Sequence, residues 1–228
     1  EKSSLSELGK RLGLEGPPLR IEGYDISHFS GREPVGTMVV FYEGRPLKKE
    51  YRRFKVRTAA KADDYAALAE VLQRRFKNQE LPPPSLILLD GGRGQLSVAQ
   101  KVLQEKSFAN IPLVALAEEQ EQIFLPGKKD PLVLPATDPA LKILQQVRDE
   151  AHRFALSLSR DLNVKNSLAS ILMKVPGIGP TRSKALLKHF GSLERLRKAS
   201  LEELTAVPSM NELSARNLYK EFHDEAGL

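Results

Sequence analysis

Apolar residues in the first two thirds of the chain form strand-length runs and helically spaced stretches, separated by turn residues. Strands are expected at 19–28, 35–42, 48–56, 86–90 and 111–116, and a short hairpin is expected from 122–125 and 132–134. Helices are expected at 65–76 with Asp63 or Asp64 as the N-cap, after Gly94, and over 139–162. Antiparallel strands come first and alternating strands and helices follow. The predicted fold class is therefore α/β, a mixed sheet flanked by helices.

The last third of the chain is wholly helical in pattern and repeats itself. After a polar stretch at 159–167, six positions recur with a period of 32 residues. Leu172, Val175, Pro176, Leu186, Lys188 and Phe190 return as Leu204, Val207, Pro208, Leu218, Lys220 and Phe222. Each copy has the pattern helix, tight turn, helix. We predict a lead segment at 1–17, an α/β domain at 18–160, a linker at 161–169 and a small all-α domain at 170–228.

Composition narrows the classes of function. The 228 residues include 35 Lys and Arg against 29 Asp and Glu, a net charge of +6 that favours polyanionic partners. The chain has no cysteine, which excludes a disulfide framework, a thiol nucleophile and a Cys-ligated metal site. Apolar runs fall short of the roughly 18 residues that a membrane span needs, so no membrane partner is expected.

The turn of the first repeat has the composition of a phosphate-binding loop. Gly177 and Gly179 allow the backbone N–H groups and the N-terminus of the next helix to surround an anion. Residues 174–198 carry seven basic side chains against one acidic side chain. The alternative is an ordinary glycine turn in a helical pair. The candidate DNA-binding residues of this repeat are Gly177, Gly179, Thr181, Arg182, Lys184 and Lys188.

The second repeat departs from this pattern. Ser209 and Asn211 stand where the first repeat has its two glycines, and residues 199–228 carry two basic side chains against six acidic ones. We therefore expect the second turn to be a packing partner of the first and a poorer phosphate binder.

Two carboxylates lie where a metal site is expected. Asp25 lies within an apolar strand and Asp90 ends the most apolar strand, so each carboxylate needs a partner. With an imidazole from His152 they would form a site for a hard divalent cation, Mg²⁺ or Mn²⁺. The alternatives are that Asp90 is a turn residue or helix cap and that His152 is an ordinary surface residue.

A basic strand is the second candidate for DNA binding. Residues 45–61 carry eight basic side chains and one acidic side chain, interleaved with Tyr51 and Phe54. Arg52, Arg53 and Lys55 are the candidate contacts to a DNA backbone. The alternative is an edge strand that charge protects from pairing with other strands.

Six motifs together resemble one known family. They are YDISH at 24–28, YRRF at 51–54, DDYAA at 63–67, LDGGRGQ at 89–95, RDEAHRF at 148–154 and VPGIG at 175–179. In order and spacing they resemble the C-terminal half of UvrC, the incision subunit of bacterial nucleotide excision repair. The likeness runs from about Pro18 to the end of the chain.

The resemblance implies a ribonuclease H-like endonuclease domain followed by a tandem helix-hairpin-helix domain, which together cut damaged DNA on the 5′ side of a lesion. The family's Asp–Asp–His triad falls on Asp25, Asp90 and His152, and a further acidic position falls on Asp63 or Asp64. Lys and Ala at 61–62 replace a glycine expected before that pair. The residues expected to support the metal ligands are His28, Gln95 and Glu150.

The resemblance also implies partners and a location. Damaged duplex DNA and a UvrB–DNA complex are the expected partners, in the cytoplasm of a bacterium. The family's N-terminal GIY-YIG nuclease domain and its UvrB-docking segment do not match this chain, so we expect it to be unable to make both incisions. Two other functions remain open: a non-catalytic, structure-specific DNA-binding module, and a nucleotidyl or strand transferase on a similar core.

Overall fold

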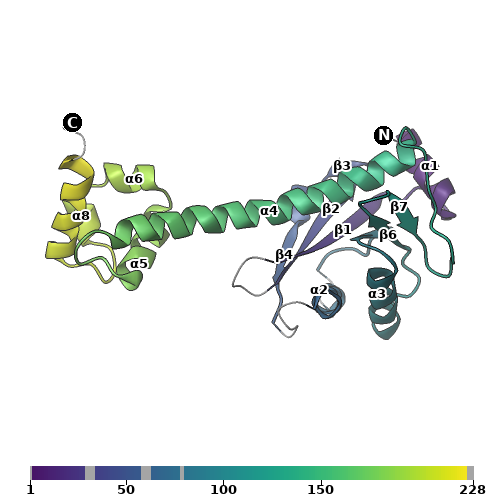
Figure 1. Cartoon of the computed structure of the whole chain (residues 1–228), viewed down its shortest axis with the longest axis horizontal. Helices are drawn as coiled ribbons and strands as arrows, with labels where there is room; N and C mark the ends of the chain where they lie inside the picture. Colours follow the sequence, from purple (N-terminus) through teal and green to yellow (C-terminus); the bar gives the residue numbers. More distant parts are fainter. Residues whose placement is uncertain (1, 29–33, 58–62, 78–79, 225–228) are drawn as a thin grey trace. The chain divides into compact units, whose positions relative to one another are not determined.

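The computed structural model describes residues 2–28, 34–57, 63–77 and 80–224, which divide into two compact units, Glu1–Ser157 and Leu158–Leu228 (Figure 1). The strands are β1 Arg20–Ser27, β2 Val35–Tyr42, β3 Arg45–Pro46, β4 Arg52–Lys55, β5 Leu86–Asp90, β6 Leu113–Ala117 and β7 Gln122–Phe124. The helices are α1 Lys2–Leu12, the 3₁₀ turn η1 Lys48–Glu50, α2 Asp64–Lys77, α3 Arg93–Glu105, α4 Pro139–Met173, α5 Pro180–Phe190, α6 Leu193–Lys198, α7 Leu201–Thr205 and α8 Glu212–Asp224.

The first unit is built on a mixed sheet with the strand order β3-β2-β1-β5-β6-β7, and β4 also pairs with β2. The central strands β1, β5 and β6 are parallel, and β2 and β7 join them antiparallel. Helices α2 and α3 cover one face, while α1 and the first part of α4 cover the other (Figure 1). The predicted α/β class and flanked mixed sheet are confirmed.

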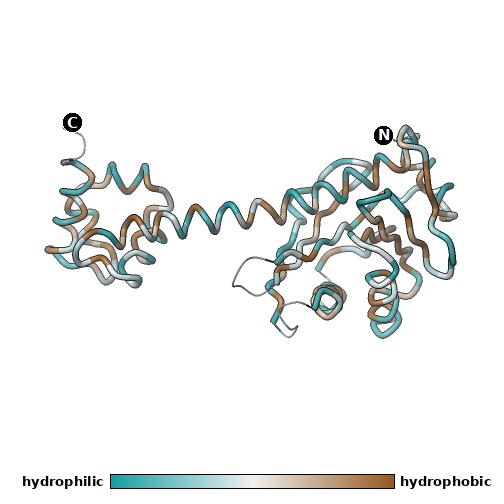
Figure 2. Tube along the Cα trace, in the orientation of Figure 1, coloured by the Kyte–Doolittle hydropathy of each residue, from teal (hydrophilic) through white to brown (hydrophobic). Residues whose placement is uncertain are grey.

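Strand β5 shows why this sheet needs both helical layers. Its side chains alternate between the two cores, with Ile87 and Leu89 toward α2 and α3, and Leu86 and Leu88 toward α4. All four are at most 1% exposed. An apolar run without alternation is the pattern of a strand buried on both faces, and Figure 2 shows hydrophobic residues running along the central strands.

Helix α4 packs unusually close to β1. Asp138 begins the helix, because its Oδ1 accepts a 2.9 Å hydrogen bond from the Ala140 N–H. Further along, Gly23 in β1 leaves no room for a side chain, since a Cβ there would lie 2.5 Å from Cγ1 of Val147. This close approach holds the first part of α4 against β1 at Gly23.

Several element boundaries differ from the predictions. Helix α4 continues to Met173, because the polar stretch 159–167 contains neither Pro nor Gly to end it, so the segment 161–169 is helical. The predicted strand at 48–56 begins as η1 and becomes β4 only at Arg52. The arm 132–134 is not a strand in the described chain and meets β7 through an Ile123–Leu132 bridge. Helix α1 was not predicted; Leu5 and Leu8 anchor it in the core under α4.

The second unit consists of two helical hairpins around a small core. The end of α4 and α5 form the first hairpin, α7 and α8 form the second, and α6 joins them. The residues that repeat in sequence occupy equivalent core positions: Leu172 and Leu204, Val175 and Val207, and Leu186 and Leu218 are all at most 4% exposed. The predicted tandem helical repeat is confirmed.

Candidate active site and nucleic-acid interface

The strand register brings Asp25 and Asp90 together. Strands β1 and β5 are parallel, and their last registered pair is Tyr24 with Leu89. The next residue on β1 is Asp25 and the next residue on β5 is Asp90, so the two aspartates lie next to each other on neighbouring strands. Side chains alternate along a strand, and Asp25 therefore shares the face of Gly23 that α4 covers. On β5, Asp90 shares the face of Leu88, and Leu88 also lies on the face that α4 covers. Both carboxylates are therefore on the same face of the sheet.

His152 on α4, the third residue of the predicted triad, lies beside Asp25. Its Nδ1 lies 3.8 Å from Oδ2 of Asp25, and the imidazole is 60% exposed while the Asp25 side chain is 9% exposed. The same Asp25 oxygen accepts a 3.0 Å hydrogen bond from the hydroxyl of Ser27. A buried carboxylate thus lies beneath an imidazole that solvent can reach.

The two carboxylates repel one another electrostatically. Burial, and after it the negative charge of Asp25, raise the pKa of Asp90 from 3.8 to about 6. Arg148 and His152 act in the opposite direction and lower the pKa of Asp90. Two carboxyl groups in this relation are a suitable place for a cation.

Arg148 is a residue of this site that the sequence analysis missed. It precedes His152 by four residues on α4 and therefore lies on the same side of the helix. Its side chain is only 10% exposed, and its Nη1 donates a 2.8 Å hydrogen bond to Oε2 of Glu121. The spacing of Arg148 and His152 within the RDEAHRF motif was the available signal.

The residues expected to support the ligands have clear contacts, although only one of them touches the turn that follows Asp90. Oε1 of Gln95 accepts a 3.0 Å hydrogen bond from the Gly92 N–H and so braces that turn. Glu150 instead accepts hydrogen bonds from the Tyr51 hydroxyl at 2.9 Å and from Arg153 at 2.6 and 2.7 Å. Arg153, followed by the Tyr51 hydrogen bond, lowers the pKa of Glu150 against the opposing effect of burial.

Asp63 and Asp64 have different roles. Asp63 is the N-cap of α2, since its Oδ1 accepts a 2.9 Å hydrogen bond from the Ala66 N–H. Asp64 pairs with the imidazole of His28, the residue that follows β1. The unexpected Lys and Ala at 61–62 lie outside the described residues. Of the two acids, Asp64 is the one whose carboxylate is directed to a neighbouring segment.

The donor set suits a divalent cation. A ribonuclease H-like nuclease fold implies such an ion, and the neighbouring carboxylates of Asp25 and Asp90 are the oxygen donors that hard cations prefer. Within the described part of the chain, no group of three or more His, Asp and Glu side chains is close enough to bind a metal ion as a preformed set. The fit therefore rests on the carboxylate pair, with His152 beside it.

The basic strand does not present its charges on one face. Alternation along β4 places Arg53 and Lys55 on the side of α4, where the guanidinium of Arg53 lies 4.4 Å from the ring centroid of Phe154. Arg52 lies on the opposite side and donates to the carbonyls of Lys49 and Tyr51. The continuous track that the sequence suggested is therefore divided between the two faces of the sheet.

The first hairpin turn has the backbone that a phosphate site needs. Gly177, in the middle of the turn 175–179, has a φ of +86°. Gly179 is the N-cap of α5 and Pro180 follows it; among the side chains that the structure describes, none caps this helix. The N–H groups at its start are therefore available to an external anion, and Thr181 is exposed beside them.

Arg182, a predicted DNA contact, also makes hydrogen bonds within the protein. Its Nη1 donates a 2.6 Å hydrogen bond to the carbonyl of Gly177, and its Nε donates a 2.8 Å hydrogen bond to the carbonyl of Ser209. The side chain thus ties the turns of the two hairpins together.

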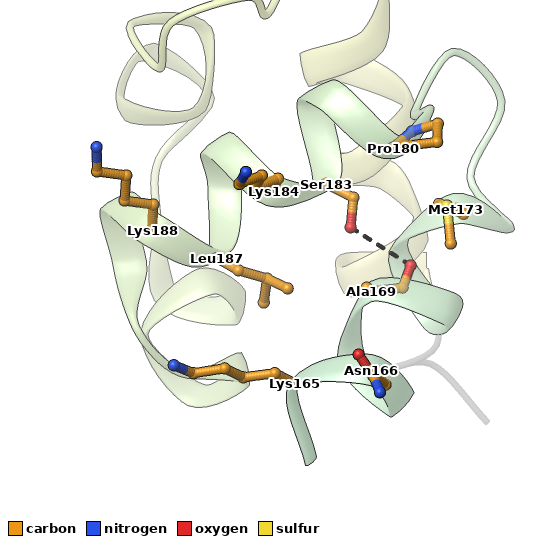
Figure 3. A pocket seen from close by; sticks show the side chains of 9 residues that line it. All are labelled: Lys165, Asn166, Ala169, Met173, Pro180, Ser183, Lys184, Leu187 and Lys188. Carbon is orange, nitrogen blue, oxygen red and sulfur yellow. Dashed lines mark hydrogen bonds between the residues drawn. The ribbon is translucent and has the colours of Figure 1, made fainter. Parts of the chain in front are cut away.

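Lys184 and Lys188 extend the positive charge of this turn along α5. Both are exposed, and both border a groove of about 460 Å³ between α5 and the end of α4. Lys165 approaches the same groove from α4, and the apolar floor includes Met173 and Leu187 (Figure 3). The groove is lined by cationic side chains and has no acidic residue among those that line it in the described structure.

Comparison with known proteins identifies the family. Residues 9–156 match the model of the UvrC RNAse H endonuclease domain. The chain belongs to the UvrC family. Residues 169–224 match the model of the SAM-like helix-hairpin-helix tandem, so both parts of the predicted resemblance are confirmed.

The relatives are UvrC proteins along nearly the whole chain. The UvrABC system protein C of Dictyoglomus thermophilum is 48% identical over 225 residues, which cover 98% of this chain and 38% of that protein. The protein of the same name from Carboxydothermus hydrogenoformans is 48% identical and covers 95% of this chain. The chain thus spans less than half the length of these UvrC relatives.

A solved structure of Ciona intestinalis endonuclease V in complex with an inosine-containing DNA covers 70% of this chain and 96% of its own, at 13% identity and a TM-score of 0.43. Among the described residues, no helix is both long and apolar enough to cross a membrane.

Proposed function

We propose that this UvrC chain is a divalent-cation-dependent endonuclease that hydrolyses a DNA phosphodiester on the 5′ side of a lesion. The observation that carries the proposal is the placement of Asp25 and Asp90 on neighbouring parallel strands, on one face, with His152 beside them. Relatives named UvrABC system protein C support the repair context.

The chain's own residues divide the work in this proposal. Asp25 and Asp90 hold the cation, for which their hard oxygen donors favour Mg²⁺ or Mn²⁺. When bound, such a cation supplies Lewis-acid polarisation of a phosphoryl oxygen and lowers the pKa of water. Ser27 orients the Asp25 carboxylate through its 3.0 Å hydrogen bond. His152, being largely exposed, carries a proton between the reacting oxygens and solvent.

DNA is held in this proposal mainly by the first hairpin. The uncapped start of α5 binds a phosphate oxygen, and Lys184 and Lys188 follow the strand onward. In the first unit, Arg53 and Lys55 are the basic residues of β4 on the side of α4, where Asp25 and Asp90 also lie. Damaged duplex DNA, delivered as a UvrB–DNA complex in the bacterial cytoplasm, is the proposed substrate.

A nicking assay tests the proposal directly. A duplex with a bubble or lesion is incubated with the wild-type chain in Mg²⁺, Mn²⁺ or EDTA, alongside Asp25→Asn and Asp90→Asn. Each substitution is expected to reduce metal-dependent nicking by more than about 100-fold while DNA binding is retained. Asp130→Asn, in an exposed loop, is the matched control. The expected products carry a 3′-hydroxyl and a 5′-phosphate.

Two results would contradict this function. Binding without nicking under every condition, including after UvrB-loaded DNA is supplied, would leave a non-catalytic DNA-binding module. Reaction only with a DNA end that bears a hydroxyl acceptor would indicate strand transfer.

The pKa of Asp90 adds a pH signature. Because its pKa is about 6, Asp90 becomes protonated as the pH falls through that value, and the carboxylate that should hold the cation is lost. Nicking should therefore decline below about pH 6, and higher cation concentration should move the decline to lower pH. The stability of the cation-free protein should change in the opposite direction. Because the pKa of Asp90 is higher in the folded protein than in the unfolded chain, protonation of Asp90 should raise the free energy of unfolding as the pH falls from 7 toward 4. Thermal melts in EDTA measure this second effect.

A further inference from the structure

Helix α8 of the second hairpin lies directly against the turn of the first hairpin. Nδ2 of Asn217 donates a 2.9 Å hydrogen bond to the carbonyl of Pro176, 41 residues earlier in the chain. Ser214 lies on the same side of α8 and next to the following turn residue, since a Cβ on Gly177 would lie 3.4 Å from Cβ of Ser214. The proposed function gives these contacts between the hairpins no role.

The Asn217 hydrogen bond fixes one particular donor of the turn. Because a trans peptide group is planar, the carbonyl of Pro176 and the N–H of Gly177 move as one unit and point in opposite directions. Gly177 is exposed, and among the hydrogen bonds of the described residues none uses its N–H. Asn217 therefore holds the carbonyl of a peptide group whose N–H is directed away from α8 and is available to an anion.

The next peptide group of the turn is also held, but its N–H is already used. Its carbonyl, on Gly177, accepts a 2.6 Å hydrogen bond from Nη1 of Arg182. Its N–H, on Ile178, donates a 3.0 Å hydrogen bond to the carbonyl of Val175. Of the two side chains that hold the turn, Arg182 thus stabilises it, whereas Asn217 also directs an N–H that no protein group accepts.

Comparison of the two repeats shows that this contact has no reciprocal. Ala185 stands 32 residues before Asn217, and Pro208 stands 32 residues after Pro176. Because alanine carries no donor, the first hairpin cannot make the same side-chain hydrogen bond to the second turn. Ala185 and Pro208 instead border a groove of about 540 Å³. The turn with two glycines is therefore also the turn that receives this hydrogen bond from the opposite hairpin.

We propose that Asn217 is a positioning residue for DNA binding: it holds the Pro176 carbonyl so that the Gly177 N–H is aligned with a phosphate oxygen. The inference rests on the proposed function, in which the first hairpin holds the DNA backbone. It gives the acidic second hairpin a part in DNA binding without contact to DNA. A donor that is already aligned in the free protein costs less entropy to order on binding.

Fluorescence anisotropy of the whole chain on a bubble duplex, repeated across a salt series, tests this proposal. Asn217→Ala removes the amide, and alanine favours a helix more than asparagine does, so α8 is not weakened. Affinity should fall by about 3- to 10-fold with an unchanged salt slope, because no cationic contact is lost. Asn217→Leu keeps the bulk without the donor and should lose as much. It carries the test if Asn217→Ala does not fold.

Ser200→Ala is the matched control. Ser200 caps α7 of the second hairpin through a 3.1 Å hydrogen bond from the Glu203 N–H to its Oγ, a contact that does not involve the first turn. Its loss should change DNA affinity by less than about 2-fold. Urea unfolding of all three variants gives their stabilities, so that affinity is compared where each protein is folded.

Affinity and salt slope together separate positioning from a merely structural role. Wild-type affinity in both folded Asn217 variants overturns the proposal, and so does an equal loss in Ser200→Ala or a reduced salt slope. Lys184→Glu with Lys188→Glu distinguishes the two levels. If this pair leaves affinity unchanged, the first hairpin does not hold DNA, and that part of the proposed function fails as well. If the pair weakens binding while the Asn217 variants do not, only the positioning role fails.

Discussion

The turn of the first hairpin, 175–179, and the turn of the second, 207–211, are built on the same backbone. Ile178 N–H bonds the carbonyl of Val175 at 3.0 Å, and in the second turn Met210 N–H bonds the carbonyl of Val207 at 3.1 Å. The residue before each donor has a positive φ, +86° at Gly177 and +74° at Ser209. Backbone shape therefore does not distinguish the two turns.

The two turns differ in what happens to the N–H groups of the following helix. Helix α5 begins with Gly179 and Pro180, and no described side chain accepts its first N–H groups. Helix α8 is capped internally, because Oδ1 of Asn211 accepts the Ser214 N–H at 2.8 Å and Oγ of Ser214 accepts the Asn211 N–H at 3.2 Å. A helix that satisfies its own N-terminus has fewer donors left for a phosphate.

Charge follows the same division. The segment 174–198 is strongly basic, whereas 199–228 is acidic, and Arg216, the repeat equivalent of Lys184, is paired with Glu212. The two copies therefore share the backbone of the turn but differ in charge and in the number of N–H groups left for an anion.

The largest expected effect comes from reversing charge at equivalent positions. Lys184→Glu with Lys188→Glu should weaken binding to a bubble duplex by about 10- to 100-fold and reduce the salt dependence, because two phosphate contacts are lost. Arg216→Glu with Lys220→Glu, 32 residues on, should change affinity by less than about 3-fold. Fluorescence anisotropy across a salt series measures both. Equal losses in the two pairs would show that the hairpins bind DNA alike.

Removing Arg182 should affect folding more than DNA binding. Arg182→Ala loses the hydrogen bonds to Gly177 and Ser209 and should lower the free energy of unfolding by about 1–2 kcal/mol. Arg195→Ala, at an exposed position on α6, should change it by less than about 0.5 kcal/mol. Urea unfolding of the two variants provides the comparison. A stable Arg182→Ala protein that has lost DNA affinity would show that Arg182 acts mainly as a phosphate ligand.

Giving the first helix the cap of the second should make the two hairpins more alike. At Gly179 the described atoms leave the space for a Cβ open to 4 Å, and its φ of −95° and ψ of −175° suit an Asn cap. Gly179→Asn should cap the Arg182 N–H, add a few tenths of a kcal/mol to stability and weaken DNA binding by about 3- to 10-fold. The melting temperature should thus rise while the DNA affinity, measured by fluorescence anisotropy, falls. Gly179→Ala adds a Cβ without a cap and controls for its bulk; an equal loss of affinity there would refute competition for the N–H groups.

The sequence predicted the helices and strands more accurately than it predicted the side-chain contacts of the candidate site. The spacing of apolar residues predicted the central strands and the helical repeat, because buried positions are occupied by apolar side chains. The adjacency of Asp25 and Asp90 needed the β1–β5 register, which residue type does not encode. The sequence did not reveal the contacts of Arg182 with two carbonyls or of Arg148 with carboxylates, because residue type alone does not say whether a cationic side chain contacts DNA, a carbonyl or a carboxylate.

The smallest effect concerns the backbone that the two turns share. Ser209 holds a φ of +74° that a glycine adopts without a Cβ penalty. Ser209→Gly should raise stability by about 0.5 kcal/mol, a net gain after the greater freedom of glycine in the unfolded chain is subtracted. Gly177→Ser makes the reverse exchange; its Cβ would lie 3.4 Å from Cβ of Ser214, an ordinary contact, so its cost should come from the backbone alone and be of similar size. Urea midpoints of the single variants and of the double swap test this. If the backbone strain is equivalent in the two turns, the double swap should have nearly wild-type stability. A double swap much less stable than wild type would show that the contacts around the two turns differ, although their backbones are alike.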